Sequence, residues 1–200
     1  MNTRDRIIDA ARDEFSIYGL AGARVDRIAR KAIVNKAMIY YHFSSKENLY
    51  REVIGSFFAE ISDRFKEHLD SSQSIEELLD KIAETYSQLL TRHSLIRPII
   101  LRELANPRDE VLDMITEMLS ASGLPGVLQA RLSEGVKDGT LRPVDPRQAV
   151  LSFILLNVGY SLVAPVANKL LRVDNTKRFI TERKQAVVDL FLYGLKVRKQ

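Results

Sequence analysis

The sequence of 200 residues predicts an all-α protein with about nine helices. The first observation is that apolar residues recur three and four positions apart along most of the chain, which is the spacing of one face of an α-helix. The second is that helix-capping residues stand before several of these periodic segments, as Ser74 and Glu77 do in the pattern S-x-x-E. The third is that no segment alternates between apolar and polar residues as a half-buried strand does. A hydrophobic fraction of 46% is sufficient to form a core for such a fold.

The first predicted helix covers residues 3–18 and carries one apolar stripe along its length. Thr3 is placed to cap its start, and Gly19 stands where helices often end in a left-handed residue. This helix has no outward polar face that suits a ligand. We therefore expect it to pack beneath the helices that follow.

Two short helices are predicted next, over residues 25–32 and 36–43, with a turn of three residues between them. Asn35, the last residue of the turn, is a suitable N-cap for the second helix. A rotation of about 100° per residue places Ile39 and Phe43 on one face of the second helix. The opposite face carries aromatic, polar and basic residues. This arrangement is typical of a helix-turn-helix motif that binds DNA.

The charge of the chain is concentrated around this motif. The stretch from Arg24 to Leu49 contains six cations and two anions, so its excess of four equals the net charge of +4 of the whole chain. A local basic surface of this kind is the electrostatic footprint of phosphate binding. A solvated helix face is the alternative interpretation of charge alone, and the helix-turn-helix pattern favours DNA.

The residues I-A-x-x-A and K-x-x-I-Y-Y-H-F-x-S-K-E-x-L resemble the signature of the tetracycline-repressor-like (TetR) family of bacterial transcriptional regulators. The resemblance covers roughly residues 4–50, with two departures. Many members have Gly where this chain has Ile33, from which we expect that the turn needs no positive φ. Many have Thr or Ser in place of Arg24, so a cation replaces a capping and phosphate-contacting hydroxyl. The resemblance implies a three-helix DNA-binding domain over residues 1–48 and a helical ligand-binding and dimerisation domain over 49–200.

The roles that the resemblance implies for the DNA-binding face are carried over only to matching positions. The candidates for contact with base edges in the major groove are Lys36, Ala37, Met38 and Tyr41. The candidates for contact with phosphates are Tyr40, His42 and Lys46, with Arg24 and Arg27 helping from the preceding helix. Tyr40 could instead be a partly buried packing residue, and Lys46 a solvated cation.

The remainder of the chain predicts six further helices. Ser44 and Glu47 form a capping box that starts the fourth helix, and the later starts include Ser74 and Asp145. The predicted ranges are 44–69, 75–92, 95–105, 108–137 with a break or kink at 122–126, 146–169, and a last helix that Asp174 or Asn175 caps and that ends near Leu195.

The last two of these helices are apolar around much of their circumference. A helix of this kind needs neighbours on more than one side. One large core within the chain would supply them, and so would a two-fold dimer in which two helices of each chain form a four-helix bundle. The resemblance implies the homodimer, which also suits recognition of a palindromic double-stranded DNA operator.

A small-molecule effector site between the helices of the C-terminal part is a further expectation from the resemblance. The candidate residues combine apolar and aromatic side chains with two polar groups, and they are Phe57, Ile61, Tyr86, Leu90, Met114, Met118, Phe153, Asn157 and Tyr160. For Asn157 and Tyr160 the alternative is a hydrogen bond to a neighbouring backbone carbonyl. Arg97 and Arg102 are possible contacts of an anionic ligand, and surface ion pairs are the alternative for both.

Several classes of function lack their sequence signals. The chain contains no cysteine, which excludes disulfides and thiolate chemistry, and it has no HExxH motif, glycine-rich phosphate loop or serine elbow. His68 and His93 are expected to be polar surface residues. The amino terminus lacks the apolar region of a secretory signal, and polar residues interrupt the apolar stretch 149–167, so we expect a buried helix there and no membrane association. The expected location is the cytoplasm.

The sequence therefore predicts a dimeric transcriptional regulator, most simply a repressor that a small, largely apolar ligand releases from a palindromic operator. No cofactor, metal ion or catalytic residue is expected. A DNA-binding regulator without a small-molecule inducer is the main alternative, and an all-α enzyme with an incidental basic motif is a weaker one.

Overall fold

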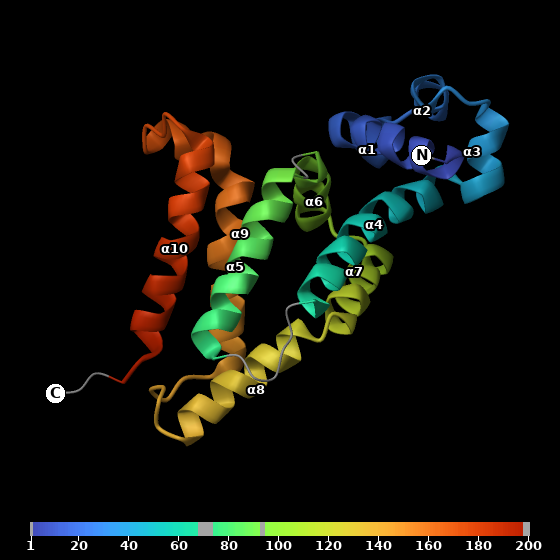
Figure 1. The fold of residues 1–200 in the computed structure, drawn as a ribbon. Coiled ribbons are helices and arrows are strands. Elements are labelled where there is room, and N and C mark those ends of the chain that lie inside the picture. Colours follow the sequence, from blue (N-terminus) through green and yellow to red (C-terminus); the bar gives the residue numbers. More distant parts are fainter. Residues whose placement is uncertain (1, 68–73, 93–94, 198–200) are drawn as a thin grey trace. The chain divides into compact units, whose positions relative to one another are not determined.

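The structure, a computed structural model, describes residues 2–67, 74–92 and 95–197, without the side chains of residues 90 and 91. These residues form ten helices (Figure 1). The helices are α1 (Thr3–Gly22), α2 (Val25–Ala32), α3 (Lys36–Phe43), α4 (Lys46–Lys66), α5 (Ile75–Arg92), α6 (Ile96–Ala105), α7 (Asp109–Ala121), α8 (Leu124–Lys137), α9 (Pro146–Leu170) and α10 (Thr176–Leu195). The all-α prediction is confirmed, and the described residues contain a single isolated bridge, between Leu141 and Lys196, and no strand.

The count is ten instead of about nine because the predicted helix 108–137 is divided into α7 and α8. The Ser122 hydroxyl donates to the carbonyl of Leu119 and accepts the backbone N–H of Leu124, and Gly123 has a φ of 73°. These contacts end one helix and begin the next. The predicted end of the fourth helix beyond residue 67, the break at 70–73, and His68 and His93 lie outside the described residues.

Two caps differ from the prediction, and three others agree with it. Asn2, not Thr3, caps α1, and its side chain forms a capping box with Asp5. The cap of α4 is Ser45, whose hydroxyl accepts the Asn48 N–H at 3.0 Å, because Ser44 has a φ of 63° at the end of α3. The Ser74–Glu77 capping box and the Asp145 cap of α9 are confirmed, and Asn175 is the cap of α10.

The chain divides into two compact units. Unit 1 comprises the described parts of 1–60 and 93–118, and unit 2 those of 61–92 and 119–200. Helices α4 and α7 each begin in unit 1 and end in unit 2. The sequence predicts a division after residue 48 between a DNA-binding domain and a ligand-binding and dimerisation domain. That division is defined by function and not by compactness, and it stays a prediction.

Unit 1 is built around the buried stripe of α1. Phe15 has no exposed surface, and its ring meets that of Tyr50 from α4 edge to face at 4.8 Å. The Tyr50 hydroxyl donates to Oε1 of the buried Glu103 on α6 at 2.7 Å, and burial raises the pKa of Tyr50. Arg108 donates to the other oxygen of the same carboxylate at 3.1 Å. Helices α1, α4 and α6 are thus joined by packing and by a satisfied buried polar group.

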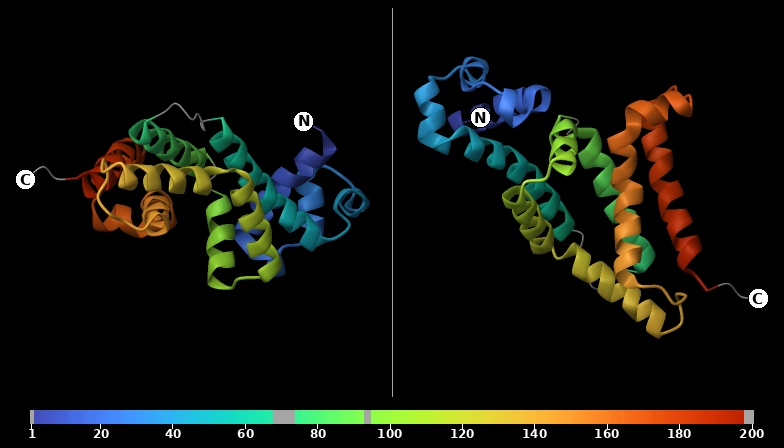
Figure 2. Two further views of the ribbon diagram at one scale, coloured as in Figure 1. Left: turned by 90° about the horizontal axis from the view of Figure 1, so that it is seen from below. Right: turned by 180° about the vertical axis from the view of Figure 1, so that it is seen from behind.

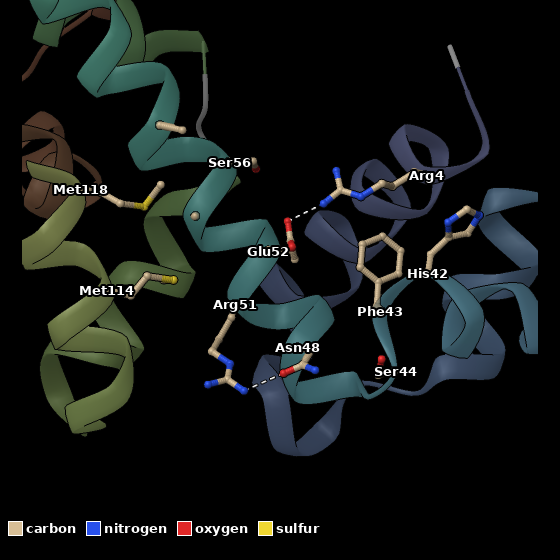
Figure 3. A pocket seen from close by; sticks show the side chains of 12 residues that line it. Arg4, His42, Phe43, Ser44, Asn48, Arg51, Glu52, Ser56, Met114 and Met118 are labelled. Carbon is tan, nitrogen blue, oxygen red and sulfur yellow. Dashed lines mark hydrogen bonds and ion pairs between the residues drawn. The ribbon is translucent and has the colours of Figure 1, made fainter. Parts of the chain in front are cut away.

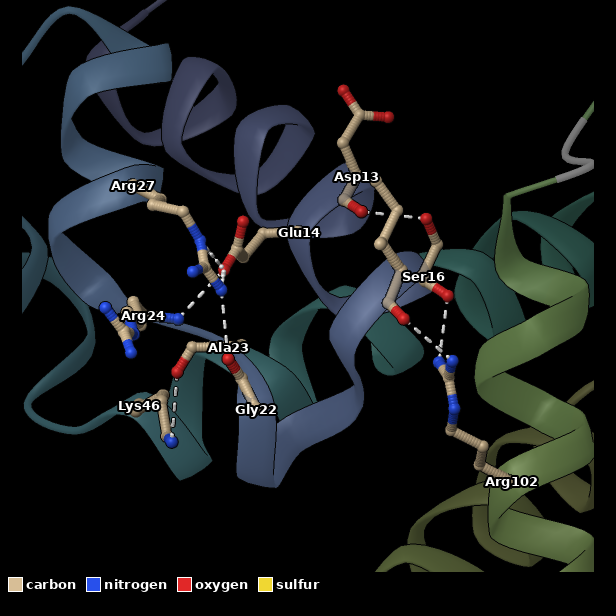
Figure 4. Close-up of polar contacts among 10 residues, drawn as sticks. Asp13, Glu14, Ser16, Gly22, Ala23, Arg24, Arg27, Lys46 and Arg102 are labelled. Carbon is tan, nitrogen blue, oxygen red and sulfur yellow. Dashed lines mark hydrogen bonds and ion pairs between the residues drawn. The ribbon is translucent and has the colours of Figure 1, made fainter.

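A second connection between α6 and α1 runs through Arg102. Gly19 has a φ of 65° and kinks α1 near its end, which interrupts the helical hydrogen-bond ladder. The Arg102 guanidinium donates to the carbonyl oxygens of Phe15, Ser16 and Ile17 at 2.8 to 3.0 Å. Figure 4 shows Arg102 directed at Ser16. Arg102 therefore completes the end of α1 and is not a surface ion-pair residue.

Unit 2 packs α5, α9 and α10 against one another, with α8 against α9. The views in Figure 2 show α9 and α10 side by side. The ring centroids of Phe153 on α9 and Phe191 on α10 lie 4.9 Å apart. The Lys184 ammonium of α10 pairs with Asp80 at 3.2 Å and Glu84 at 3.1 Å, both on α5. Apolar rings fill the interior, and this ion-pair cluster fixes α10 against α5.

Helix α9 is only partly buried in the single chain. Its buried residues are Ala149, Val150, Phe153 and Ala164, and it also presents exposed large apolar side chains at Leu151, Leu155, Val163, Val166 and Leu170. The expectation of a buried helix is therefore met on one side alone. By length and composition α9 could cross a membrane, a test that core helices of soluble proteins also pass.

Candidate nucleic-acid interface

Helices α2 and α3 form the helix-turn-helix arrangement that the sequence predicts. The Val34 N–H donates to the carbonyl of Ala29 at 3.0 Å and closes the turn after α2. The Asn35 side chain accepts the Ala37 N–H at 3.0 Å, so the predicted N-cap of α3 is confirmed. Ile39 is fully buried and Phe43 nearly so, as their shared face requires. The opposite face of α3 stays free.

The expectation that the turn needs no positive φ is wrong. Ile33 lies in the left-handed region, with a φ of 55° and a ψ of 53°. A left-handed backbone brings the Cβ of an L-residue too close to the neighbouring carbonyl oxygen, and a β-branched residue suffers most. The geometry of the turn is therefore one that glycine adopts without strain. Ile33 adopts the same geometry with its side chain 81% exposed.

The free face of α3 carries the predicted base-contacting residues. Tyr41 is 80% exposed, Lys36 and Ala37 are exposed, and Met38 is half-buried. The Lys36 ammonium lies 3.0 Å from a carboxylate oxygen of Asp26 on α2, and the hydrogen bond and charge of Asp26 raise the pKa of Lys36. The exposed side of α3 thus carries an aromatic hydroxyl, and at its first residue a cation whose charged form the ion pair with Asp26 favours.

The start of α2 is organised by a buried carboxylate. Arg24 is the N-cap residue but its side chain makes no capping hydrogen bond. Instead the Glu14 carboxylate of α1, which is 8% exposed, accepts the Arg24 N–H at 2.9 Å and Arg27 Nε at 2.7 Å (Figure 4). Arg27 also donates to the carbonyl of Gly22 at 2.9 Å, and its guanidinium lies 4.1 Å from the centroid of the Tyr18 ring. Arg27 is therefore engaged within the chain, and hydrogen bonding to Glu14 raises its pKa.

A polar concavity of about 420 Å³ lies beside this helix start. Its lining brings together the exposed N-cap residue Arg24, the cation Lys36, the half-exposed Tyr40 and the serines that follow α3. Lys46 also lines it, and its ammonium donates to the carbonyl of Ala23 at 3.3 Å. Two carboxylates, Asp26 and Glu47, also line the concavity, and Asp26 is paired with Lys36. The helix N-terminus and the remaining cations and hydroxyls suit an anion of the size of a phosphate.

The remaining predicted phosphate residue, His42, is placed differently. Its side chain is half-buried, and the centroid of its ring lies 5.2 Å from that of the Tyr41 ring. Its Nε2 atom is buried without a hydrogen-bond partner among the described residues. Arg24 and Arg30, in contrast, are exposed, and their guanidinium groups have no partner within the part of the chain that the structure describes. The sequence analysis did not single out Arg30 for a phosphate role.

Sequence reasoning also missed Glu14, which positions both Arg24 and Arg27. Its signal was available, because Glu14 interrupts the apolar stripe between Ala11 and Phe15 on the buried face of α1. An acid in such a stripe needs a buried partner. Arg102 carried no comparable signal, since its acceptors are backbone carbonyls at a kink.

The predicted effector residues are distributed over both units. Phe57, Met114 and Met118 lie in unit 1, and Ile61, Tyr86, Phe153, Asn157 and Tyr160 lie in unit 2. Phe57, Ile61, Tyr86 and Phe153 are buried. Asn157 donates to the carbonyl of Phe153 at 2.8 Å, and the Tyr160 hydroxyl donates to the Asn168 side chain at 2.6 Å. The side chain of Leu90 lies outside those described.

The fold and this site define a helix-turn-helix transcriptional regulator, and comparison with known proteins agrees. Residues 7–53 match the family described as bacterial regulatory proteins, tetR family. The HTH-type transcriptional repressor SCO4008 of Streptomyces coelicolor is 31% identical, over 84% of this chain and 83% of that protein. The HTH-type transcriptional regulator UidR of Escherichia coli is 24% identical, over 82% and 81%. The chain belongs to the tetR family.

Solved structures share the fold along almost the whole chain. The transcriptional regulator FadR from Bacillus subtilis, solved in complex with stearoyl-CoA, has a TM-score of 0.76 at 20% identity, over 95% of this chain and 98% of FadR. The regulator PfmR from Thermus thermophilus has a TM-score of 0.75 at 22% identity, over 99% and 100%. Regulators of this family bind DNA and ligands and are usually dimers.

Proposed function

We propose that this regulator is a homodimeric repressor that binds a palindromic DNA operator through α3 and leaves it when a small ligand binds. The observation that carries the proposal is the free face of α3, where a rigidly capped helix presents Lys36 and the exposed Tyr41 to solvent. A helix with one buried and one free polar face fits the major groove. Tyr41, Lys36, Ala37 and Met38 contact base edges in this proposal.

The concavity beside α2 supplies the phosphate contacts. Lys46 already donates to one carbonyl, and its remaining N–H groups are directed at an anion in this proposal. Arg24 and Tyr40 border the same concavity, and the exposed Arg30 adds a cation on α2. Arg27 acts indirectly, because its guanidinium is held by Glu14. The role of His42 as a phosphate ligand stays a prediction. The burial of its Nε2 atom argues against that role.

Selection of bound sites from random duplex DNA tests the recognition part of this proposal. The expected result is a palindromic consensus. Tyr41→Ala should relax the preferred sequence and cost roughly 1–3 kcal/mol in binding to the consensus duplex, because a base contact is lost. Lys46→Ala should weaken binding to all duplexes alike and lower the slope of affinity against salt by about one. Recovery of random sequences, or an unchanged salt slope for Lys46→Ala, would overturn these assignments.

The exposed apolar face of α9 supports the homodimer. Leu155, Val163 and Leu170 lie on α9, and Leu190 and Tyr193 extend the apolar surface on α10. Contiguous apolar surfaces of this kind are rare on soluble monomers. Two copies of α9 and α10 would cover one another as a four-helix bundle, which makes the dimer preferable to one large core within the chain.

A ligand response is supported by the family and by the aromatic interior of both units. The similar protein FadR binds stearoyl-CoA, which is consistent with an effector that carries an apolar part. A DNA-binding regulator without an inducer is the alternative, and titration of candidate effectors against the selected duplex separates the two. The cytoplasm is the proposed location, as operator binding requires.

A further inference from the structure

Unit 1 contains a groove of about 700 Å³ on the exposed side of α4, away from the apolar core (Figure 3). The buried side of α4 carries Leu49, Val53 and Phe57, whereas the groove is lined by residues on its other side. The start of α1, the end of α3 and the methionines of α7 complete the lining. The groove is therefore separate from the aromatic interior in which an effector was predicted, although Met114 and Met118 belong to both sets.

One end of the groove is apolar and adaptable. Gly55 of α4 faces Met114 and Met118 of α7, and a Cβ at residue 55 would lie 3.8 to 4.0 Å from their sulfur and methyl atoms. Ala59 adds a further small apolar surface. Thioether side chains adapt to ligands of different shape, and the absence of a side chain at Gly55 leaves space for one.

The polar part of the lining contains two guanidinium groups, which Figure 3 shows on different sides of α4. Arg4 of α1 lies over the Phe43 ring at 5.4 Å and uses one nitrogen to bind Glu52 at 2.6 Å. Arg51 of α4 binds Glu110 at 3.0 Å and Asn48 at 2.6 Å. An arginine has five N–H donors, so both retain donors for an anion.

The acidic partners do not block an anion. Glu52 and Glu110 keep 48% and 79% of their side-chain surface exposed. Exposed ion pairs of this kind contribute little, so a ligand carboxylate can share or replace them at small cost. The buried Nε2 of His42, which has no partner among the described residues, is a further unused polar atom in the lining.

We infer that this groove binds a small amphipathic anion, with its carboxylate or sulfonate at Arg51 and the Asn48 amide and its apolar part against Met114, Met118 and Gly55. Binding requires contacts of unit 1 alone and is independent of the proposed operator. Its consequence for regulation rests on the proposed function: the lining includes His42 and Phe43 at the end of α3, so a ligand here contacts the recognition helix itself.

The four methionines of the chain provide a direct assay, since two of them line the groove and Met38 lies on α3 outside the lining. Full-length protein with ¹³C-labelled methionine methyl groups is titrated with octanoate, 1-octanol and octylammonium below their micelle concentrations. We expect saturable shifts of the Met114 and Met118 methyl signals, with octanoate binding at least about tenfold more tightly than 1-octanol, the size of a lost charged hydrogen bond. Octylammonium should bind most weakly.

Two variants locate the site. Arg51→Gln should remove the preference for octanoate over 1-octanol, because the anion loses its cation. Gly55→Leu should fill the apolar end and abolish the shifts, whereas Gly126→Leu, at an exposed helical glycine with open space around it, should not change them.

Equal affinities for the three compounds would overturn the inference, and so would the absence of saturable shifts at Met114 and Met118. An unchanged octanoate affinity in a folded Gly55→Leu protein would also contradict it. If Gly55→Leu loses its helical circular dichroism, the Arg51→Gln variant decides the result. These titrations are made without DNA, so a negative result does not bear on the proposed operator binding. Likewise, failure to select an operator does not bear on the proposed ligand site.

Discussion

The free face of α3 and the free face of α9 are both exposed, but they differ in how the chain supports them. On α3 the exposed Tyr41 stands among polar and basic residues, and the Asn35 and Glu14 side chains accept the backbone hydrogen bonds that fix the starts of α3 and α2. On α9 the exposed residues are leucines and valines, such as Leu155 at 56% and Leu170 at 77% exposed. The first surface is suited to a polar ligand, and the second to an apolar partner.

Exposure therefore has different consequences on α3 and on α9. A single exposed tyrosine within a basic surface costs little in water, because its hydroxyl remains hydrated. A row of exposed aliphatic side chains along one helix is unfavourable unless another surface covers it. The recognition motif is therefore complete in one chain, whereas the α9–α10 surface is completed by a second copy in the proposed dimer.

The largest expected effect is on the α9 surface. Leu155→Glu places a carboxylate in the proposed interface twice, once from each copy, and an unpaired buried charge is costly. We expect the dimer dissociation constant to rise at least about 100-fold, or ~2.7 kcal/mol, in sedimentation equilibrium. Leu104→Glu, which changes an exposed leucine of α6 in unit 1, is the matched control and should leave the association state unchanged. If Leu155→Glu and Leu104→Glu had the same dimer dissociation constant, the exposed face of α9 would not be the dimer interface.

A smaller effect is expected from the carboxylate that supports the motif. Glu14→Ala removes the acceptor of the Arg24 N–H and of Arg27 Nε, so the free energy of unfolding should fall by about 2–3 kcal/mol. Glu14→Gln retains a neutral acceptor and should lose clearly less. Urea unfolding of the two variants measures the difference. A fully stable Glu14→Ala protein would show that the motif does not depend on this internal support.

The smallest expected effect concerns the turn. Ile33→Gly relieves the left-handed strain of a β-branched residue, and this gain exceeds the entropy that glycine adds to the unfolded chain. We expect a stabilisation of about 0.5–1 kcal/mol in thermal or urea unfolding. Ile33→Ala keeps the Cβ at the same backbone geometry and should give no comparable gain. A lower midpoint for Ile33→Gly than for Ile33→Ala would mean that the exposed side chain stabilises the turn.

The sequence could predict the helices because each depends on local signals. Asn35, Asp145 and the Ser74–Glu77 pair cap their helices as expected, and the spacing of Ile39 and Phe43 assigns the buried face of α3. The turn at Ile33 was mispredicted because its geometry is set by the packing of two helices, and the residue present is the wrong type for that geometry.

The site could be predicted in part for the same reason. The exposed face of α3 follows from helical periodicity, so the exposure of Tyr41 could be predicted, while its contact with DNA stays a prediction. The engagement of Arg27 with Glu14 depends on how α1 crosses α2, which no local spacing contains. The groove beside α4 combines residues from four helices far apart in sequence, so only Met114 and Met118 among its apolar lining were anticipated.

The most direct test of the proposed function is the stoichiometry of the complex with a selected duplex, measured by sedimentation equilibrium. The account predicts two chains per duplex, with half-sites whose centres lie about one helical turn, or a multiple of it, apart. It also predicts that Leu155→Glu binds the same duplex much more weakly while its α3 face is unchanged. A stable single chain that binds an asymmetric site with full affinity would contradict the account.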